Sequence, residues 1–564
     1  MASLNRKSCR GHTYWQIVES RRINGKPRPI VLMHLGTADT LLQRLQKDPL
    51  KPKTAKILEF GALAALWNIA EELCLVKTID KYAPKREQGL SCGQYMLLAA
   101  LNRCVHVSSK SSLYDWYRRT VLQRLLPATK SALTSQRFWD HMNSLNEDII
   151  SQIEEELARL LVNHFKIDLN TLLFDATNFD TYINTLTVCS LAQRGHAKSK
   201  RKDLRLLGLA LLVSTDFQVP LFSHLYPGNQ HDSKTFNNVI ESLVARYRIF
   251  AQQCKEITLV YDGGNNSNEN ASQVDKSKYH FVTSLTITHH KDLLSIPLRR
   301  FNPLKGARLK DVLAYRTSKV IWGKERTVVI VRSPQLLAGQ IAGIISTLKK
   351  KRDKLYELRS KLLHTQKPET RGKGYTRQSL QNQLNDIVSG QYISEILKAK
   401  ITGTKKNMDF TFYTDPTAFN KLKQYRLGKR ILCTDNQNWT TEEIVLASRA
   451  QFHVENAFKQ MKNPHWVSFS PVFHWTDQKL RVHAFYCILA LTMCALLQRK
   501  ASQSGIDISI PELLKNLSEV QEVVNLYAPA SGKGRFRAEF LLSERSGLQE
   551  RLCRIFEVYK HCRP

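Results

Sequence analysis

Five apolar runs of strand length between residues 166 and 285 constrain the fold of this chain more than any other feature. They read TLLFD, LRLLGLALLVS, VPLFSHL, ITLVYD and YHFVTSL. Short apolar runs bounded by turn residues are typical of buried strands. A helical pattern at 233–249 separates the third run from the fourth. The order strand, strand, strand, helix, strand predicts an α/β sheet.

Length and charge narrow the class of protein. The 564 residues are several times the usual size of one domain, so we expect three or four packed units. Because 42% of the residues are apolar, the chain can bury cores, and wholesale disorder is excluded. There are 84 Lys and Arg against 49 Asp and Glu, a net charge of +35. The excess recurs along the whole chain, which favours nucleic acid over a membrane surface as the partner.

Changes in hydrophobic pattern and composition along the sequence predict a multi-domain α/β protein with six regions. They are a β-rich segment at 1–54, with two strands around the turn at Gly25-Lys26-Pro27; a helical domain at 55–165, expected to bind DNA; the first part of an α/β core at 166–285; an α+β insertion domain at 286–430; the second part of the core at 431–500; and a helical region at 501–564. The strand pair around Gly323 and the long charged helix near 338–366 break the rhythm of the core. We therefore expect the insertion to stand apart from the sheet.

Several classes of site are not expected. The longest apolar run, 484–497, is shorter than the roughly 20 residues that cross a bilayer, so it predicts a buried helix and no membrane partner. The N-terminus has no apolar signal core, and the 11 cysteines are scattered without a CxxC pair. This pattern indicates a reducing cytoplasm and no zinc site. No Walker A pattern occurs, so no nucleotide cofactor is expected.

Three carboxylates occupy positions that fit one active site. Asp175 and Asp262 each close a strand run, and Glu455 lies within a helix expected at about 441–462. Acids at strand ends are held at the edge of a sheet, where ligands of α/β proteins commonly bind. Three oxygen ligands of this kind suit Mg²⁺ or Mn²⁺, and two such ions stabilise the attacking and leaving oxygens of a phosphodiester.

Each acid also has an ordinary structural interpretation. An Asp after an apolar strand is most often a turn former or a helix cap, and Glu455 with Lys459 is a common surface ion pair. The order of the elements favours the active-site interpretation over the ordinary one. An RNase H-like core has this same order: three strands, a helix, a strand and then a helix that carries a carboxylate. Three other acids, Asp180, Asp232 and Asp435, are interpreted as turn residues.

At these motifs the chain resembles the DDE transposases of bacterial insertion sequences, in the group whose RNase H-like core is split by an insertion between the second and third acid. The matching segments, which extend over roughly residues 12–500, are YWQIVESRRINGKPRPIVLMHLG, LLFDATNFDTYI with Asp175, RGHAKSKRKDLRLLGLALLVS, VPLFSHLYPGNQHD, LVYDGGNNSNEN with Asp262, and HVENAFKQMK with Glu455. The resemblance implies a transposase in which these three acids are catalytic and hold two Mg²⁺ or Mn²⁺ ions.

The segment around the third acid follows the group's signature in part. The signature is a Tyr, two residues, Arg, three residues, Glu, six residues and Lys. Glu455 and Lys462 keep the six-residue gap, whereas Gln451 stands at the Arg position and Ser448 at the Tyr position. On one continuous helix Lys459 and Lys462 would share a face with Glu455, with Lys462 about 10.5 Å along the axis. Lys462 is expected to hold a phosphate beside the scissile one, and a solvated basic face is the alternative.

A basic segment at 194–205, RGHAKSKRKDLR, follows the first acid. Its cations, which we expect to contact the DNA backbone, are Arg194, Lys198, Lys200, Arg201 and Lys202. Phosphate contacts of this kind give affinity and register rather than sequence choice. A solvated loop is the alternative.

The resemblance implies a function, the cutting and joining of double-stranded DNA at terminal inverted repeats and in target DNA, within a bacterial cytoplasm at the nucleoid. The resemblance further implies a homodimer that pairs two DNA ends, with a hairpin intermediate in second-strand cleavage. Two alternatives stay open. One is a catalytically decayed repressor of the element, and the other is an RNase H-like nuclease without strand transfer.

Overall fold

The chain forms two compact units. The computed structural model describes residues 2–9, 11–23, 26–46, 51–84, 89–199, 201, 203–230, 236, 239, 242, 256–277, 279–366, 374–404, 407–529 and 534–563. The first unit comprises Met1–Ala65, Asp115–Pro127 and Lys515–Pro564, and the second comprises Leu66–Tyr114 and Ala128–Leu514. The helix expected at 233–249 lies almost wholly outside the described residues.

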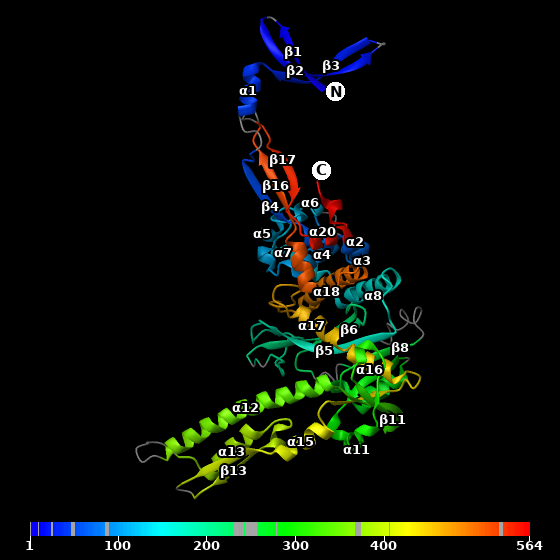
Figure 1. Ribbon diagram of the computed structural model, residues 1–564, viewed down its shortest axis with the longest axis vertical. Coiled ribbons are helices and arrows are strands. Elements are labelled where there is room, and N and C mark those ends of the chain that lie inside the picture. The colour runs from blue at the N-terminus through cyan, green and yellow to red at the C-terminus, as the bar shows by residue number, and fades with distance from the viewer. Residues whose placement is uncertain are drawn as a thin grey trace. The chain divides into compact units, whose positions relative to one another are not determined.

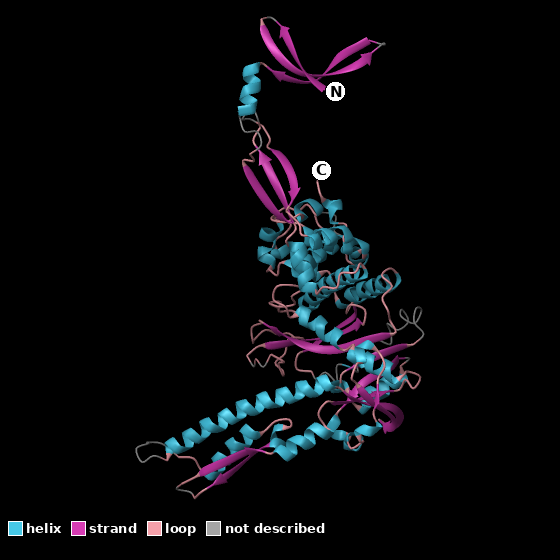
Figure 2. Cartoon of the chain, in the orientation of Figure 1, coloured by secondary structure: helices cyan, strands magenta, loops and turns pink. Residues whose placement is uncertain are grey.

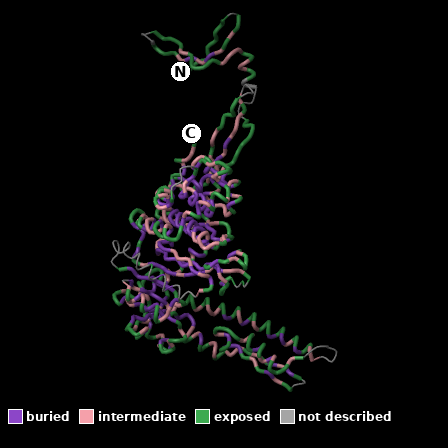
Figure 3. Tube along the Cα trace, turned by 180° about the vertical axis from the view of Figure 1, so that it is seen from behind, coloured by how far each residue is buried: buried purple, intermediate pink, exposed green. Residues whose placement is uncertain are grey.

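A three-stranded antiparallel sheet begins the first unit. Its strands are β1 (Ala2–Cys9), β2 (His12–Ile23) and β3 (Lys26–Gly36), and α1 (Ala38–Gln46) follows. The predicted strand pair is confirmed as β2 and β3, and β1 is an additional strand that the sequence interpretation missed. Figure 3 shows that most of this sheet is exposed.

A second sheet joins distant parts of the sequence within the same unit. It has the order β17-β16-β4, with β4 (Thr54–Glu59), β16 (Gln521–Tyr527) and β17 (Arg537–Leu542). The prediction of a helical region at 501–564 is therefore wrong in part, although α19 (Ile510–Ser518), α20 (Gly547–Ile555) and η6 (Val558–His561) are helical. In β16 the residues on one face, Glu522 and Val524, are buried, and Arg124 forms an ion pair of 2.8 Å with Glu522.

The predicted helical region is largely confirmed, and a buried helix lies at its centre. Its helices are α2 (Gly61–Glu72), α3 (Leu75–Tyr82), α4 (Cys92–Val105), η1 (Lys110–Ser112), α5 (Leu113–Tyr117), α6 (Leu122–Leu125), α7 (Ser135–Asn143) and α8 (Glu147–Asn163). The apolar run forms α18 (Asp477–Gln503), which packs against α4, α7, α8 and β7. By length and composition α18 could cross a membrane, but 94% of its most apolar window is buried inside the protein. It is a core helix, as predicted.

A nine-stranded mixed sheet organises the second unit (Figure 2). Its order is β10-β11-β12-β15-β9-β8-β5-β6-β7. The five predicted strands are confirmed as β5 (Thr171–Thr181), β6 (Arg205–Ser214), β7 (Pro220–Pro227), β8 (Ile257–Tyr261) and β9 (Tyr279–Leu285). The first three are antiparallel neighbours, while β8 runs parallel to β5 and β9 runs parallel to β8.

The strand pair around Gly323 continues this sheet, so the prediction that it stands apart is wrong. β11 (Leu313–Ile321) and β12 (Lys324–Arg332) join the sheet because β12 pairs with β15 (Lys429–Thr434), which pairs with β9. The run TVVIV in β12 is buried throughout, as in an interior strand. Trp322 and Gly323 both have positive φ, 51° and 76°, as a two-residue hairpin turn requires.

The remainder of the predicted insertion builds its own small core. The long charged helix is α12 (Pro334–Thr365), accompanied by α13 (Arg377–Val388), α14 (Ile393–Ile396), β13 (Leu397–Thr402), β14 (Asp409–Thr414) and α15 (Pro416–Tyr425) (Figure 1). Buried Leu355, Leu362, Leu380 and Phe410 hold these elements together. The other short elements of this unit are η2 (Gly263–Asn265), α10 (Asn268–Lys276), η3 (Ile287–His289), α11 (Lys291–Leu294), η4 (Leu298–Arg300), β10 (Asn302–Pro303) and η5 (Ala307–Leu309).

The helix expected at 441–462 is two helices. α16 (Thr441–Arg449) and α17 (Phe452–Met461) are separated at Ala450 and Gln451, and Lys462 follows the end of α17. The single-helix geometry assumed for Glu455, Lys459 and Lys462 is therefore wrong for Lys462, which caps the helix.

Candidate active site

The first two acids lie next to each other on neighbouring strands. In the parallel pair β5–β8, Phe174 is opposite Tyr261, so Asp175 and Asp262 are the next residues in register. Paired residues of parallel strands point to the same face, and neighbouring strands are about 4.8 Å apart. The register therefore places the two acids at neighbouring positions of the sheet, and their action as one site stays a prediction.

The local backbone fixes the direction of Asp262. Asp262 caps η2, and its Oδ1 accepts hydrogen bonds from the Gly263 N–H at 2.8 Å and from Ser284 Oγ at 3.2 Å. A Cβ at Gly263 would lie 2.6 Å from the Ser284 carbonyl oxygen, so the turn can approach β9 only with glycine there. Asp262 is exposed, whereas Asp175 is half-buried in the middle of β5.

Glu455 is brought to the same strand by α17. Its helix packs against β5 and β6, and Glu455 is exposed in the first turn. One turn earlier, Gln451 Nε2 donates a hydrogen bond of 3.1 Å to the Phe174 carbonyl, immediately before Asp175. In the described part of the chain, however, no three His, Cys, Asp or Glu side chains lie close enough to form a metal-binding group. The third acid is near the strand of the first without completing such a group.

The substituted signature positions have structural roles. Gln451 tethers the start of α17 to β5, and Ser448 is buried in α16 at 8% exposure. Arg449, which is out of register with the signature, donates a hydrogen bond to the Arg308 carbonyl. A side-chain amide thus holds the backbone of β5 where the signature places a guanidinium.

Two lysines from different elements reach β5 beside Asp175. Lys462 Nζ donates a hydrogen bond of 2.7 Å to Thr177 Oγ1, and Lys198 Nζ donates one of 2.7 Å to the Ala176 carbonyl. Burial of the ammonium and the nearby Lys198 lower the pKa of Lys462, while Asp175 and Asp180 act in the opposite direction. The site is therefore a pair of carboxylates flanked by two cations. Lys459 is exposed on α17 and takes no part in this cluster within the described residues.

The basic segment runs along the second half of β5. Asn178 Nδ2 donates to the His196 carbonyl at 3.0 Å, and Ser199 Oγ donates to Asp180 Oδ1 at 3.0 Å. Arg194 is exposed, and Arg201 is paired with Asp203. Lys200 and Lys202 lie outside the described residues. Of the predicted cations in this segment, the structure brings Lys198 to the acids.

The rival acids serve other contacts. Asp180 accepts the Ser199 hydroxyl, and Asp435 accepts the Phe281 N–H at 2.8 Å and contacts His280 Nδ1 at 3.0 Å. Asp435 therefore supports β9 as well as ending β15, which the turn interpretation missed. Asp232 lies outside the described residues.

The sequence interpretation also missed Asp477. Its carboxylate accepts the backbone N–H groups of Ser190, at 3.1 Å, and Leu191, at 2.9 Å. Burial opposes ionisation of Asp477, but its hydrogen bonds from Cys189, Ser190 and Leu191 prevail and lower its pKa to about 2. The cue in the sequence was an Asp directly after Thr476, the pattern of a helix N-terminus.

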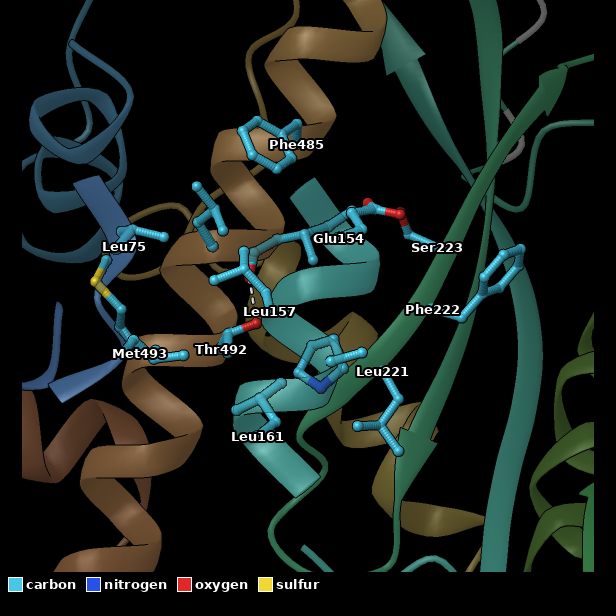
Figure 4. Close-up of a pocket in the computed structure, with 15 residues that line it drawn as sticks. Leu75, Glu154, Leu157, Leu161, Leu221, Phe222, Ser223, Phe485, Thr492 and Met493 are labelled. Carbon is cyan, nitrogen blue, oxygen red and sulfur yellow. Dashed lines mark hydrogen bonds between the residues drawn. The ribbon is translucent and has the colours of Figure 1, made fainter. Parts of the chain in front are cut away.

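An apolar pocket of the second unit lies apart from these groups. Figure 4 shows it between α8, α18 and β7, lined by side chains that include Leu157, Leu221 and Phe485. It contains none of the acids or lysines described above. The candidate site is therefore on β5 and directly after β8, and not in this pocket.

Comparison with known proteins identifies the family. The chain matches the transposase DDE domain over residues 167–493. No curated protein matches it in sequence. A piggyBac transposase synaptic complex with hairpin DNA, solved by cryo-EM, is similar over 83% of this chain and 82% of that chain, with 8% identity and a TM-score of 0.37, which is too low to transfer any feature. The family match covers more than half of the chain and spans the strands and the helix that carry the three acids, so this protein belongs to the DDE transposase family.

Proposed function

We propose that this transposase cuts DNA at the ends of its own element and joins the freed 3′ ends to target DNA. The observation that carries the proposal is the position of Asp175 and Asp262 directly after Phe174 and Tyr261, which pair on parallel strands, with Lys198 and Lys462 bonded to β5 beside Asp175. Carboxylates that bind divalent cations and ammonium groups that bind phosphates are both needed to handle a phosphodiester.

We infer that the core is RNase H-like. The part of the sheet ordered β7-β6-β5-β8-β9, with three antiparallel strands followed by two parallel ones, supports this inference. In this arrangement the first acid lies on the central strand, the second on its parallel neighbour, and the third on a helix packed over the sheet.

The donor set fits Mg²⁺ or Mn²⁺. Asp175 and Asp262 offer neighbouring carboxylate oxygens, and we propose that Glu455 supplies the third ligand for two ions. When bound, the ions would activate the attacking oxygen and stabilise the departing one. The protein itself holds the strand and the helix in place: Gln451 fixes the start of α17 on the Phe174 carbonyl, and Ser284 orients Asp262.

The cations would position the DNA. Lys462 and Lys198 would hold phosphates beside the scissile one, and Lys459, Arg194 and Arg201, with Lys200 and Lys202, would contact the backbone further away. A net charge of +35 supports double-stranded DNA as the partner. We further propose a homodimer that pairs two ends, acting in a bacterial cytoplasm at the nucleoid, in line with the group that the sequence resembles.

Replacement of the second acid tests the proposal. Asp262→Asn should abolish cleavage of DNA carrying the element's ends while leaving binding to the same DNA largely unchanged, because an amide keeps the shape of the side chain and removes the charge that binds the ions. Asp175→Asn and Glu455→Gln should behave in the same way. The matched control is Asp435→Asn, which should keep cleavage. Cleavage by Asp262→Asn at the wild-type rate would disprove the assignment.

One observation favours a second candidate, a catalytically decayed repressor of the element. The three acids do not form a metal-binding group in the described residues, and Gln451 and Ser448 replace the signature Arg and Tyr. A wild-type protein that binds the ends but does not cut them with Mg²⁺ or Mn²⁺ would assign this role. Analysis of the products on a supercoiled target separates a nuclease, which cuts without joining, from a transposase.

A further inference from the structure

The N-terminal sheet has one covered face and one open face. Among the described side chains of β1–β3, only Gln16 and Val18 are buried, at 5% and 6% exposure, and their positions in β2 put them on the same face. The helix that packs against β2 and β3 is α1. We therefore assign α1 to the face of Gln16 and Val18, which leaves the opposite face open.

The strand register defines the side chains of the open face. Leu4 and Met33 both lie opposite Ile17, Arg6 lies opposite Trp15, and Arg21 lies opposite Arg28. Residues that are paired across antiparallel strands share a face. The described side chains of the open face therefore include four cations, Arg6, Arg21, Lys26 and Arg28, and five large apolar side chains, Leu4, Trp15, Ile17, Ile30 and Met33.

The charge of this segment is more one-sided than that of the whole chain. Residues 1–37 contain seven Lys and Arg and a single acid, Glu19. Glu19 is on the open face and forms an ion pair of 2.7 Å with Arg21. Arg6 and Arg28 are exposed and have no carboxylate within ion-pair distance among the described residues. Glu19 therefore neutralises Arg21, while Arg6 and Arg28 remain as cations of the open face without an acidic partner among the described residues.

Protein partners fit this face poorly. A second copy docked face to face would bring like charges together, which destabilises an interface. A strand added to the edge of β3 would meet Pro27 and Pro29, and Pro removes the N–H that strand pairing needs. A polyanion, in contrast, would satisfy the cations, and the apolar side chains between them would contact bases or sugars.

We propose that the sheet β1–β3 binds double-stranded DNA through the face that carries Arg6, Arg21, Lys26 and Arg28. The outer strands of a three-stranded sheet lie about 10 Å apart, and the major groove is about 12 Å wide and accepts β-strands. The cations near the β2–β3 turn contact one stretch of phosphates, and Arg6 beside Trp15 contacts another. This inference rests on the proposed function, because it adds a second DNA contact outside the site that contains the acids.

A pair of matched double variants of the full chain tests the inference. Arg6→Ala with Arg28→Ala removes two cations from the open face, and Lys7→Ala with Arg22→Ala removes two exposed cations from the covered face of the same sheet. The probe is a duplex taken from the DNA that flanks the gene. The open-face variant should raise Kd roughly tenfold and reduce the slope of log K against log salt by about 1.8, because each lost phosphate contact contributes about 0.9.

The covered-face variant should bind DNA with the same Kd as the wild type, because salt at physiological concentration screens the attraction between charges beyond about 8 Å. Equal binding by the two variants would overturn the inference. A second result would also overturn it. If the wild type sediments as a dimer without DNA and the double variant Leu4→Glu with Met33→Glu sediments as a monomer, the open face binds a second copy of the chain and not DNA. Circular dichroism checks that all variants fold.

Cleavage by the same proteins separates this inference from the proposed function. If the wild type binds the duplex but never cuts it with Mg²⁺ or Mn²⁺, the proposed function fails while the binding comparison still stands. If the wild type cuts and the open-face variant binds and cuts equally well, the proposed function stands and the role of the sheet fails.

Discussion

A buried lysine in the helical part of the second unit should destabilise the protein at neutral pH. Lys110 is 8% exposed, its Nζ lies 4.3 Å from the centroid of the Tyr486 ring, and it donates to the Tyr486 hydroxyl at 3.2 Å. Within the described residues no carboxylate forms an ion pair with it. Arg103, also buried, adds a second positive charge nearby. We expect Lys110→Met to be more stable than the wild type.

The magnitude follows from the pKa of Lys110. Burial and the Arg103 charge lower it from 10.5 to about 7, partly opposed by Cys487. A difference of about 3.5 pKa units corresponds to about 5 kcal/mol between the folded and unfolded states. The contact of the ammonium with the Tyr486 ring stabilises the folded state by about 1–2 kcal/mol and offsets part of this difference. The net destabilisation below pH 7 is therefore about 3 kcal/mol.

The pH dependence has a definite sign. Between pH 7 and 10.5 the unfolded chain keeps the proton on Lys110 and the folded chain releases it, so the unfolded state binds more protons. The free energy of unfolding therefore rises with pH across this range. In Lys110→Met, which is of similar length and carries no charge, this part of the pH dependence should be absent. Tyr486 keeps a partner in the variant, because its hydroxyl also contacts His483 Nδ1 at 2.6 Å.

Chemical unfolding followed by circular dichroism at about pH 6.5 and pH 9.5 measures both effects. Lys110→Met should be more stable than the wild type by about 3 kcal/mol at the lower pH and by about 1 kcal/mol at the higher pH. The control is Lys130→Met, an exposed lysine in the same unit, which should change neither value. A Lys110→Met variant that is less stable at pH 6.5, or that keeps the wild-type pH slope, would refute this reasoning.

Two further substitutions test the surroundings of the site. Lys462→Ala, which loses the hydrogen bond to Thr177, should weaken binding to end DNA and slow cleavage without changing the dependence of cleavage on Mg²⁺. Lys459→Ala, at an exposed position, should alter the free energy of unfolding by under about 1 kcal/mol and leave cleavage nearly unchanged. Equal effects of the two substitutions on cleavage would contradict the assignment of Lys462 as a phosphate-binding residue. Asp477→Ala should lower the free energy of unfolding by about 1–2 kcal/mol after allowance for screening. This loss should be present above pH 3.8 and should disappear as the pH falls through about 2, because the wild-type carboxylate is then protonated. A difference in the free energy of unfolding that stays constant down to about pH 2 would contradict this prediction.

The strands and the first two acids could be predicted because their causes are local. A strand buried on both faces requires a continuous apolar run, and β5, β6 and β8 each have one. Asp175 and Asp262 end apolar stretches, and the parallel pairing of their strands is enough to bring them side by side. Nothing beyond neighbouring strands is needed for that placement.

The errors arose where distant partners decide the structure. The helix at 441–462 breaks at Gln451, whose side chain bonds to Phe174, 277 residues earlier. β16 forms a strand because β4, from the other end of the chain, provides its partner. β12 joins the sheet through β15, about 100 residues later in the sequence. In each case the local sequence permits the observed element, but the partner that selects it cannot be recognised from spacing.

The segment after α17 links the helical core to the strand of the first acid. His483 contacts the Phe469 carbonyl at 2.7 Å from α18, and the Phe469 N–H donates to the Met461 carbonyl at the end of α17. On its other side, the Phe469 ring stacks on Phe179 of β5 with centroids 4.1 Å apart. One residue thus contacts the core helix, the helix of the third acid and the strand of the first.

This link bears on the choice between an active and a decayed transposase. Lys462 directly follows Met461, and its ammonium lies 5.4 Å from the Phe179 ring, so its placement depends on the same packing as Phe469. A substitution in the α18 core that shifts Phe469 should impair the site although all three acids are intact. A variant that loses cleavage therefore has an impaired acid cluster only when its thermal stability is unchanged. In a variant that loses both cleavage and thermal stability, we attribute the loss of cleavage to displacement of Lys462 and of the helix that carries Glu455.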